Sequence, residues 1–160
     1  MIVTGESLTP VIVEALAGGS SVRMTVTGKS MQPFMRNNDV AVLRAVDEGP
    51  IGVGEIVLAR RADGTFILHR VRRVSSDGYH LAGDAQRDIE GPLPRASIVA
   101  RVPAIIRRGK EICLDRGLRR LAGLFWIRSA PLGPALVAWA GRLKQAVQQT
   151  RNLPPSGRYS

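Results

Sequence analysis

The chain has 160 residues, a length that allows one compact domain and a tail. Its net charge is +10, and only 4% of its residues are aromatic, so Val, Leu, Ile and Ala must build the core. A single cysteine, Cys113, excludes an internal disulfide, and two histidines with one cysteine are too few for a convincing zinc site. We therefore expect neither a metal nor another cofactor.

The first predicted element is a short helix over residues 7–18. Thr9 can cap it, Pro10 suits its first turn, and Gly18-Gly19 ends it. The early acidic residue Glu6 and the lack of a basic cluster argue against a signal peptide. The sequence contains no run of about 20 apolar residues, the length that a membrane-spanning helix requires. We expect a cytoplasmic protein, either soluble or peripheral at a membrane.

A strand, a turn and a second strand are predicted between residues 21 and 43. Apolar and polar residues alternate from Val22 to Val26, as in a half-buried strand, and an apolar run resumes at Val40. Turn-forming residues lie between the two strands, together with one hydroxyl, that of Ser30. A serine at a sharp strand exit can expose its hydroxyl and direct its own N–H to the same point, which suits a nucleophile with half an oxyanion hole. Taken alone, such a serine is more often an ordinary turn residue.

A β-hairpin is predicted next. Residues 54–60 form a β-rich run, Asp63-Gly64 is a strong turn signal, and residues 66–74 form the return strand. His69 stands in a mainly apolar part of that strand. Its ordinary pKa of about 6.5 allows it to take and return a proton, so His69 is our candidate general base.

Other ionisable residues compete for the remaining roles. Lys29 adjoins the serine, but neighbours on a strand point to opposite faces, so we prefer the histidine as base. Asp84, Asp88 and Glu90 lie in a loop after the next strand, and a carboxylate could orient the histidine by fixing its tautomer. The second histidine, His80, is interpreted as a surface strand residue. Serine, histidine and carboxylate together form a candidate triad.

Turn signals recur at regular spacing between residues 21 and 107. They stand at residues 47–50, 63–64, 75–78 and 91–94. This spacing favours a mainly β architecture, either barrel-like or a sandwich. A short N-terminal helix and a helical, basic C-terminal tail would accompany it.

Four motifs, in this order, resemble those of the type I signal peptidase and LexA-like superfamily of serine peptidases. Gly28-Lys29-Ser30-Met31-Gln32-Pro33 is similar to the nucleophile motif, and Gly54-Glu55-Ile56-Val57 to a Gly-Asp-Ile-Val motif. His69-Arg70-Val71 resembles the histidine motif of the archaeal and endoplasmic-reticulum branch, and Gly83-Asp84-Ala85 resembles a Gly-Asp-Ala motif. Residues 98–102 are similar to the closing strand. Export signal peptidases of this kind usually begin with a membrane anchor, and we expect this chain to be a member without one.

The resemblance implies a serine endopeptidase that cleaves a leader or signal segment from a precursor peptide or protein. Ser30 would be the nucleophile and His69 the general base. The substrate would bind as an extended strand along an edge near residues 24–28, with small residues at the cleavage site. Some relatives have an assisting hydroxyl two residues before the serine, where this chain has Gly28, so a second oxyanion donor must come from elsewhere.

The orienting carboxylate stays open among three residues. Asp84 matches one aspartate of the family directly and is our first choice. Another family aspartate falls on Glu90, and Asp88 is the aspartate nearest to it. A glutamate can orient a histidine, although its side chain is longer. Glu55 replaces a family aspartate to which we assign a structural role.

The composition changes at residue 108. Arginines and lysines surround two short apolar segments, residues 121–126 and 136–139, neither of which could span a bilayer. Trp with flanking Arg suits a helix at an anionic membrane surface, and packing on the domain or on a partner protein is an equal alternative. We divide the chain into an N-terminal helix and linker (1–20), a β-rich peptidase domain (21–107), a basic and apolar helical tail (108–151) and a disordered end (152–160).

The net charge keeps a second class open, a basic β-rich binding module for nucleic acid or an anionic membrane. Aromatic residues that would stack on bases are scarce, so a nucleic-acid partner is not expected. A self-cleaving repressor of the same superfamily would need a helical DNA-binding domain, for which the N-terminal stretch is too short.

Overall fold

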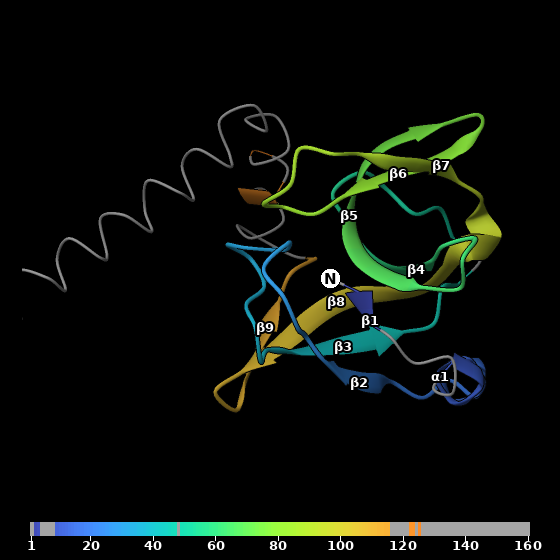
Figure 1. Cartoon of the computed structure of the whole chain (residues 1–160). Coiled ribbons are helices and arrows are strands. Elements are labelled where there is room, and N and C mark those ends of the chain that lie inside the picture. Colours follow the sequence, from blue (N-terminus) through green and yellow to red (C-terminus); the bar gives the residue numbers. More distant parts are fainter. Residues whose placement is uncertain (1, 4–8, 48, 116–121, 124, 126–160) are drawn as a thin grey trace, which may run out of the picture.

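The computed structural model of the chain describes residues 2–3, 9–47, 49–115, 122–123 and 125. Figure 1 shows their arrangement, and the elements follow in chain order. They are β1 (Ile2–Val3), α1 (Thr9–Ala17), β2 (Val22–Thr25), β3 (Val40–Arg44), β4 (Ile56–Arg60), β5 (Phe66–Ser75), β6 (Gly78–Ala82), β7 (Glu90–Leu93), a 3₁₀ helix (Arg95–Ser97), β8 (Ile98–Arg107) and β9 (Lys110–Cys113).

All nine strands belong to one antiparallel sheet. The strand order is β2-β3-β8-β4-β5-β6-β7, with β1 beside β5 and β9 beside β8. The predicted mainly β class is therefore confirmed. Among the described residues, the path of strands begins at β2 and ends at β7, so the sheet is open, and β2 pairs on one side only, with β3.

The turns follow the local sequence. Asp63-Gly64 closes the predicted hairpin between β4 and β5, where the N–H of Thr65 donates to the carboxylate of Asp63 at 2.9 Å. The hairpin between β8 and β9 corrects the sequence prediction, which placed residues from 108 onward in a helical tail, whereas β9 is a strand of the sheet. Its two turn residues, Arg108 and Gly109, have φ values of 52° and 75°, as a tight hairpin turn requires.

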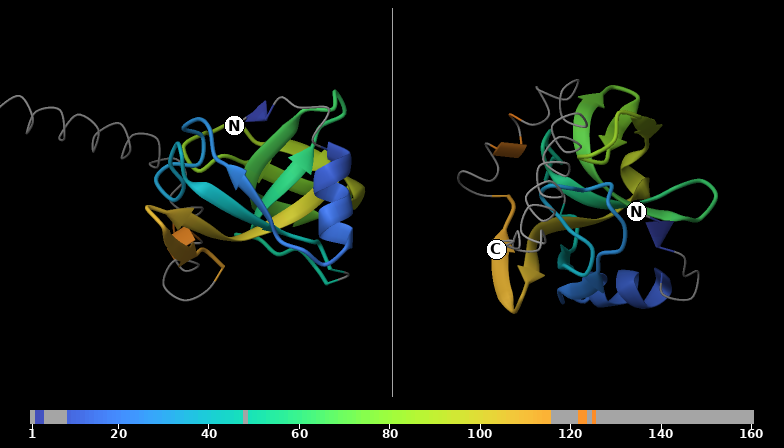
Figure 2. Two further views of the ribbon diagram at one scale, coloured as in Figure 1. Left: turned by 90° about the horizontal axis from the view of Figure 1, so that it is seen from below. Right: turned by 60° about the vertical axis from the view of Figure 1, so that its left-hand side comes forward.

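The predicted N-terminal helix is present as α1. The N–H of Gly18 donates to the carbonyl of Glu14, and the N–H of Gly19 donates to that of Leu16, so the glycine pair ends the helix. Leu16 is buried and joins the core. Figures 1 and 2 show α1 at the end of the curved sheet opposite β9.

Two apolar clusters cover the two faces of the sheet, and β5 contributes to both. Phe66 and Leu68 belong to one cluster, whereas Ile67 and Val71 belong to the other. Alternation along a strand therefore directs His69 to the face of Ile67 and Val71, and its next neighbour to the opposite face.

Most of the predicted tail and the predicted disordered end lie outside the described residues, at residues 116–121, 124 and 126–160. Within the described part of the chain, no helical segment has the length and apolar character that a bilayer crossing needs.

Candidate active site

Ser30 lies in the loop between β2 and β3. Two backbone hydrogen bonds close the base of this loop, from Val26 N–H to the carbonyl of Asp39 at 2.7 Å and from Asn38 N–H to the carbonyl of Val26 at 2.8 Å. Gly28 has a φ of 98°, a conformation that strains any residue with a side chain. A hydroxyl-bearing residue at position 28, two before the serine, would be strained in this conformation.

Buried side chains hold the loop in place. Met31 and Met35 are almost fully buried in the core. The carboxylate of Asp39 accepts hydrogen bonds from Arg107 at 2.9 and 2.7 Å and from the backbone N–H of Arg36 at 2.7 Å. Burial by itself would raise the pKa of Asp39, but the hydrogen bonds and charges of the two arginines together lower it. The loop is therefore anchored by an ionised carboxylate.

The loop after β6 packs directly on Ser30. The N–H of Ala85 donates to the carbonyl of Ser30 at 2.8 Å. A Cβ atom added at Gly83 would lie 2.6 Å from that carbonyl oxygen and 3.0 Å from the Cβ of Ser30. Position 83 therefore accepts only glycine while Ser30 keeps this place.

Strand pairing relates Ser30 to His69. Arg70 on β5 is paired with Ala82 on β6. Continuing this register by one residue puts Gly83 opposite His69, and directly opposed residues direct their side chains to the same face. Ser30 occupies the space above Gly83, so it lies beside the position that His69 faces.

His69 itself is buried, with an exposed fraction of 3%. Neither of its ring nitrogens has a hydrogen-bond partner among the described residues. Burial, which disfavours the charged ring, is the largest cause that lowers the pKa of His69 to about 4. The imidazole is therefore neutral at physiological pH.

The three candidate carboxylates have different surroundings. Glu90, at the start of β7, places Oε1 3.5 Å from Nδ1 of His69. Both oxygens of Asp84 are instead engaged by Arg70, at 2.7 Å each, and Arg72 lies 3.5 Å away. Asp88 is exposed. The assignment of the orienting role to Asp84 stays a prediction, and the structure gives this residue another partner.

Sequence reasoning missed the role of Arg70. Its guanidinium is buried and donates to the carbonyl of Gly54 at 2.8 Å. The Cζ atom of Arg70 also lies 4.8 Å from the centre of the Phe34 ring, over the face of that ring. It thereby ties β5 to the loop after β6 and to the serine loop. A basic residue within a buried apolar strand was the available signal, because such a charge needs a buried partner.

His80 corrects another expectation, since it is not a surface residue. Only 7% of it is exposed. Its Nε2 lies 2.9 Å from both the Arg73 guanidinium and the hydroxyl of Ser75. These contacts belong to the end of the β5–β6 hairpin and not to the site of Ser30.

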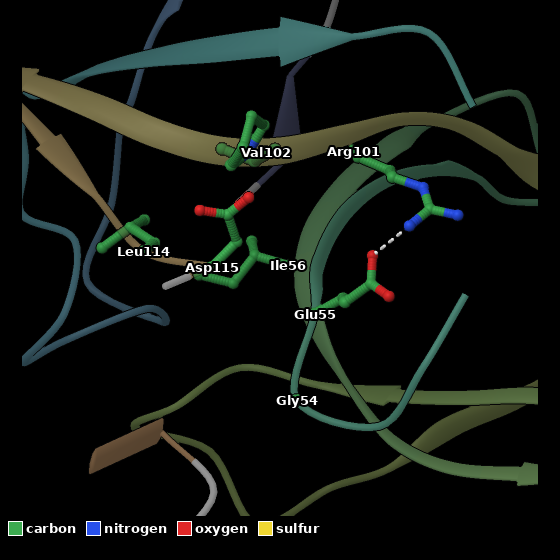
Figure 3. A pocket seen from close by; sticks show the side chains of 8 residues that line it. Gly54, Glu55, Ile56, Arg101, Val102, Leu114 and Asp115 are labelled. Atoms are coloured by element: carbon green, nitrogen blue, oxygen red, sulfur yellow. Dashed lines mark hydrogen bonds and ion pairs between the residues drawn. The ribbon is translucent and has the colours of Figure 1, made fainter. Parts of the chain in front are cut away.

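Glu55 and a nearby pocket form a separate, structural feature (Figure 3). Glu55 accepts hydrogen bonds from Gly52 N–H and from Arg101, both at 2.8 Å, which agrees with a structural role. Glu55 and Arg101 themselves line this pocket of about 170 Å³, together with Val102, Leu114 and Asp115 among others. Ser30 and His69 do not line it. Among the described residues, no group of three or more His, Cys, Asp or Glu side chains could hold a metal ion.

A mainly β fold that brings a loop serine beside the strand of a buried, neutral histidine has the architecture of a serine-type peptidase. The family model described as Peptidase S24-like matches residues 5–102, which is more than half of the chain, and the chain belongs to this family. The matched range contains Ser30, His69, Asp84 and Glu90. The resemblance stated from the motifs is thus confirmed at the level of the family. Comparison with curated proteins gave no significant match.

Proposed function

We propose that this chain is a serine endopeptidase that removes a leader or signal segment from a precursor peptide or protein. Ser30 is the nucleophile and His69 the general base. The observation that carries the proposal is the packing of Ser30 on Gly83, at the position opposite the buried ring of His69. Family membership supports the reaction class.

The proposed reaction follows from these positions. Nε2 of His69 takes the hydroxyl proton of Ser30 while Oγ attacks the scissile carbonyl carbon, and the N–H of Ser30 stabilises the oxyanion that forms. The imidazolium then returns the proton to the leaving amine, which leaves an acyl-enzyme. A water molecule hydrolyses this ester through the same two proton transfers.

We assign the orienting role to Glu90 rather than to Asp84 or Asp88. Glu90 is the carboxylate beside Nδ1 of His69, whereas the two oxygens of Asp84 are occupied by Arg70. A proton held on Nδ1 by Glu90 leaves the lone pair of Nε2 available for Ser30. Glu90 is held ionised by its hydrogen bond with Arg61, which lowers the pKa of this carboxyl.

The substrate is proposed to bind as an extended strand beside β2 and the residues up to Gly28. Within the part of the chain that the structure describes, β2 pairs with β3 alone, which leaves its other edge open to a peptide. The edge leads directly into the loop of Ser30. Backbone hydrogen bonds would supply affinity there, and alternate side chains would select the sequence.

The test is mass spectrometry of precursor peptides from the same cell, incubated with wild type, Ser30→Ala or Lys29→Ala protein. Lys29 is an exposed neighbour of the nucleophile and serves as the matched control. We expect wild type and Lys29→Ala to cleave at one site flanked by small residues, and Ser30→Ala to leave the peptides intact. Equal cleavage by wild type and Ser30→Ala would contradict the proposal.

The alternative function, a basic module that binds an anionic surface, is favoured by the net charge of +10. The tail from residue 108 would supply such a peripheral contact with a membrane or a membrane protein. This alternative would be supported if neither wild type nor Ser30→Ala cleaved the peptides while both bound anionic vesicles or DNA in a salt-sensitive way.

A further inference from the structure

Arg61 and Glu90 form a two-point ion pair across 29 positions of sequence. Nε of Arg61 donates to Oε2 of Glu90 at 2.7 Å, and the terminal NH2 group donates to Oε1. Arg61 directly follows β4, whereas Glu90 begins β7. Both side chains are partly buried, with exposed fractions of 30% and 26%. The planar fork of an arginine fixes a carboxylate in position and in rotation, which a lysine does not.

The same carboxylate is adjacent to His69. Oε1 of Glu90, which accepts from Arg61, lies 3.5 Å from Nδ1 of the ring. Among the described carboxylates, Glu90 alone lies within 4.0 Å of a ring nitrogen of His69. Neither ring nitrogen has a hydrogen-bond partner among the described residues, so this contact is the nearest approach of a described carboxylate to the ring. Glu90 is therefore the described carboxylate placed to accept a hydrogen bond from Nδ1 and so to select the tautomer of the ring.

We propose that Arg61 is a positioning residue, which holds Glu90 so that one carboxylate oxygen stays beside Nδ1 of His69. The meaning of this arrangement for catalysis rests on the proposed function. The geometric effect does not, because it concerns the proton on the ring and is measurable without substrate. Without Arg61, the flexible side chain of Glu90 is free to adopt other rotamers, and the ring loses the acceptor that selects its tautomer.

The test is the tautomer of His69, measured by long-range proton–nitrogen NMR on wild type, Arg61→Gln and Arg60→Gln proteins. The chain has two histidines, so His69 is identified by its absence in His69→Gln, and His80 is an internal reference. Arg60 is the exposed neighbour of Arg61, and its substitution removes the same charge. We expect the Nδ1–H tautomer in wild type and Arg60→Gln, and a shift towards Nε2–H in Arg61→Gln.

A second variant guards against a folding defect. Glu90→Gln removes the carboxylate charge while it keeps the shape of the side chain, and we expect the same tautomer shift. An unchanged tautomer in both variants, or an equal shift in Arg60→Gln, would overturn the proposal.

Kinetics separate this inference from the proposed function. In an active enzyme we expect Arg61→Gln to lower kcat by about 10- to 100-fold with little change in KM, since it loosens the base and leaves the substrate edge intact. Arg61→Lys keeps the positive charge but not the planar two-point contact of the guanidinium, so its kcat should lie between those of Arg61→Gln and wild type. If the tautomer shifts in Arg61→Gln but wild-type protein cleaves no peptide, the peptidase proposal is refuted and the positioning role of Arg61 stands.

Discussion

At the scale of single residues, the burial of His69 makes the stability of the fold depend on pH. The folded state holds a neutral ring with a pKa of about 4, whereas the unfolded chain takes up a proton below about 6.5. Because only the unfolded state gains this proton between those values, acid favours unfolding. Above pH 6.5 neither state is protonated and the effect disappears.

The expected loss of stability on lowering the pH from 7.5 to 5 through this one group is about 2 kcal/mol. We therefore predict that urea unfolding of His69→Gln protein is less sensitive to pH than that of wild type by this amount. Equal pH dependence in wild type and His69→Gln would show that the ring is not desolvated in the folded state.

The same burial predicts how activity depends on pH. The base stays neutral until the pH approaches 4, so the acidic limb of kcat/KM should lie well below the ordinary histidine value of about 6.5. A pH profile of peptide cleavage measures it directly. A midpoint between pH 6 and 7 would contradict the burial of His69 in the free enzyme.

Gly83 offers a residue-scale test of the contact with the serine. In Gly83→Ala, the new methyl group would meet the carbonyl oxygen of Ser30 at 2.6 Å, so the serine must move. We expect loss of cleavage and a destabilisation of about 1–3 kcal/mol, typical of overpacking. Gly18→Ala is the matched control, since its Cβ would lie 3.6 Å from the nearest atoms. A fully active Gly83→Ala enzyme would contradict the described position of Ser30.

At the scale of elements, the ion pair of Arg70 and Asp84 joins β5 to the loop that follows β6. Asp84→Asn removes the carboxylate charge and leaves a buried guanidinium without its counter-ion. We expect a loss of about 3–5 kcal/mol in unfolding free energy, measured in urea. Asp88→Asn, at an exposed position of the same loop, should change it by less than about 0.5 kcal/mol. Similar effects of the two substitutions would show that Arg70 does not depend on Asp84.

The elements also show what local sequence could predict. Asp63-Gly64 specified a hairpin through its own turn chemistry, with the mainly apolar start of β5 as its return strand, and the apolar alternation specified β2. β9 was missed because Ile112 is its only residue that is not exposed, which leaves no periodic pattern. The partner of Asp84 could not be predicted either, because it depends on strand register and on which face of β5 Arg70 occupies. For the same reason, burial of His80 went unrecognised.

At the scale of the whole molecule, binding to anionic surfaces is expected to depend on net charge and not on the active site. The net charge of +10 predicts attraction to anionic surfaces whatever the active site does. We expect wild type and Ser30→Ala to sediment equally with anionic vesicles at low salt and to dissociate at high salt, because surface charges are then screened. Binding that depends on Ser30, or that resists salt, would contradict an electrostatic origin.

The short strand β1 has a consequence for substrate access. It pairs with β5 at Phe66 and Ile67, and this pairing ends two residues before His69. The edge of β5 at Phe66 and Ile67, close to the histidine, is thus already covered by residues of the same chain. A peptide that needed this edge would bind only the fraction of molecules in which β1 has been released. Its apparent affinity would then equal the intrinsic affinity multiplied by that fraction, so the population of an open state, rather than the contacts alone, would set how tightly the peptide binds.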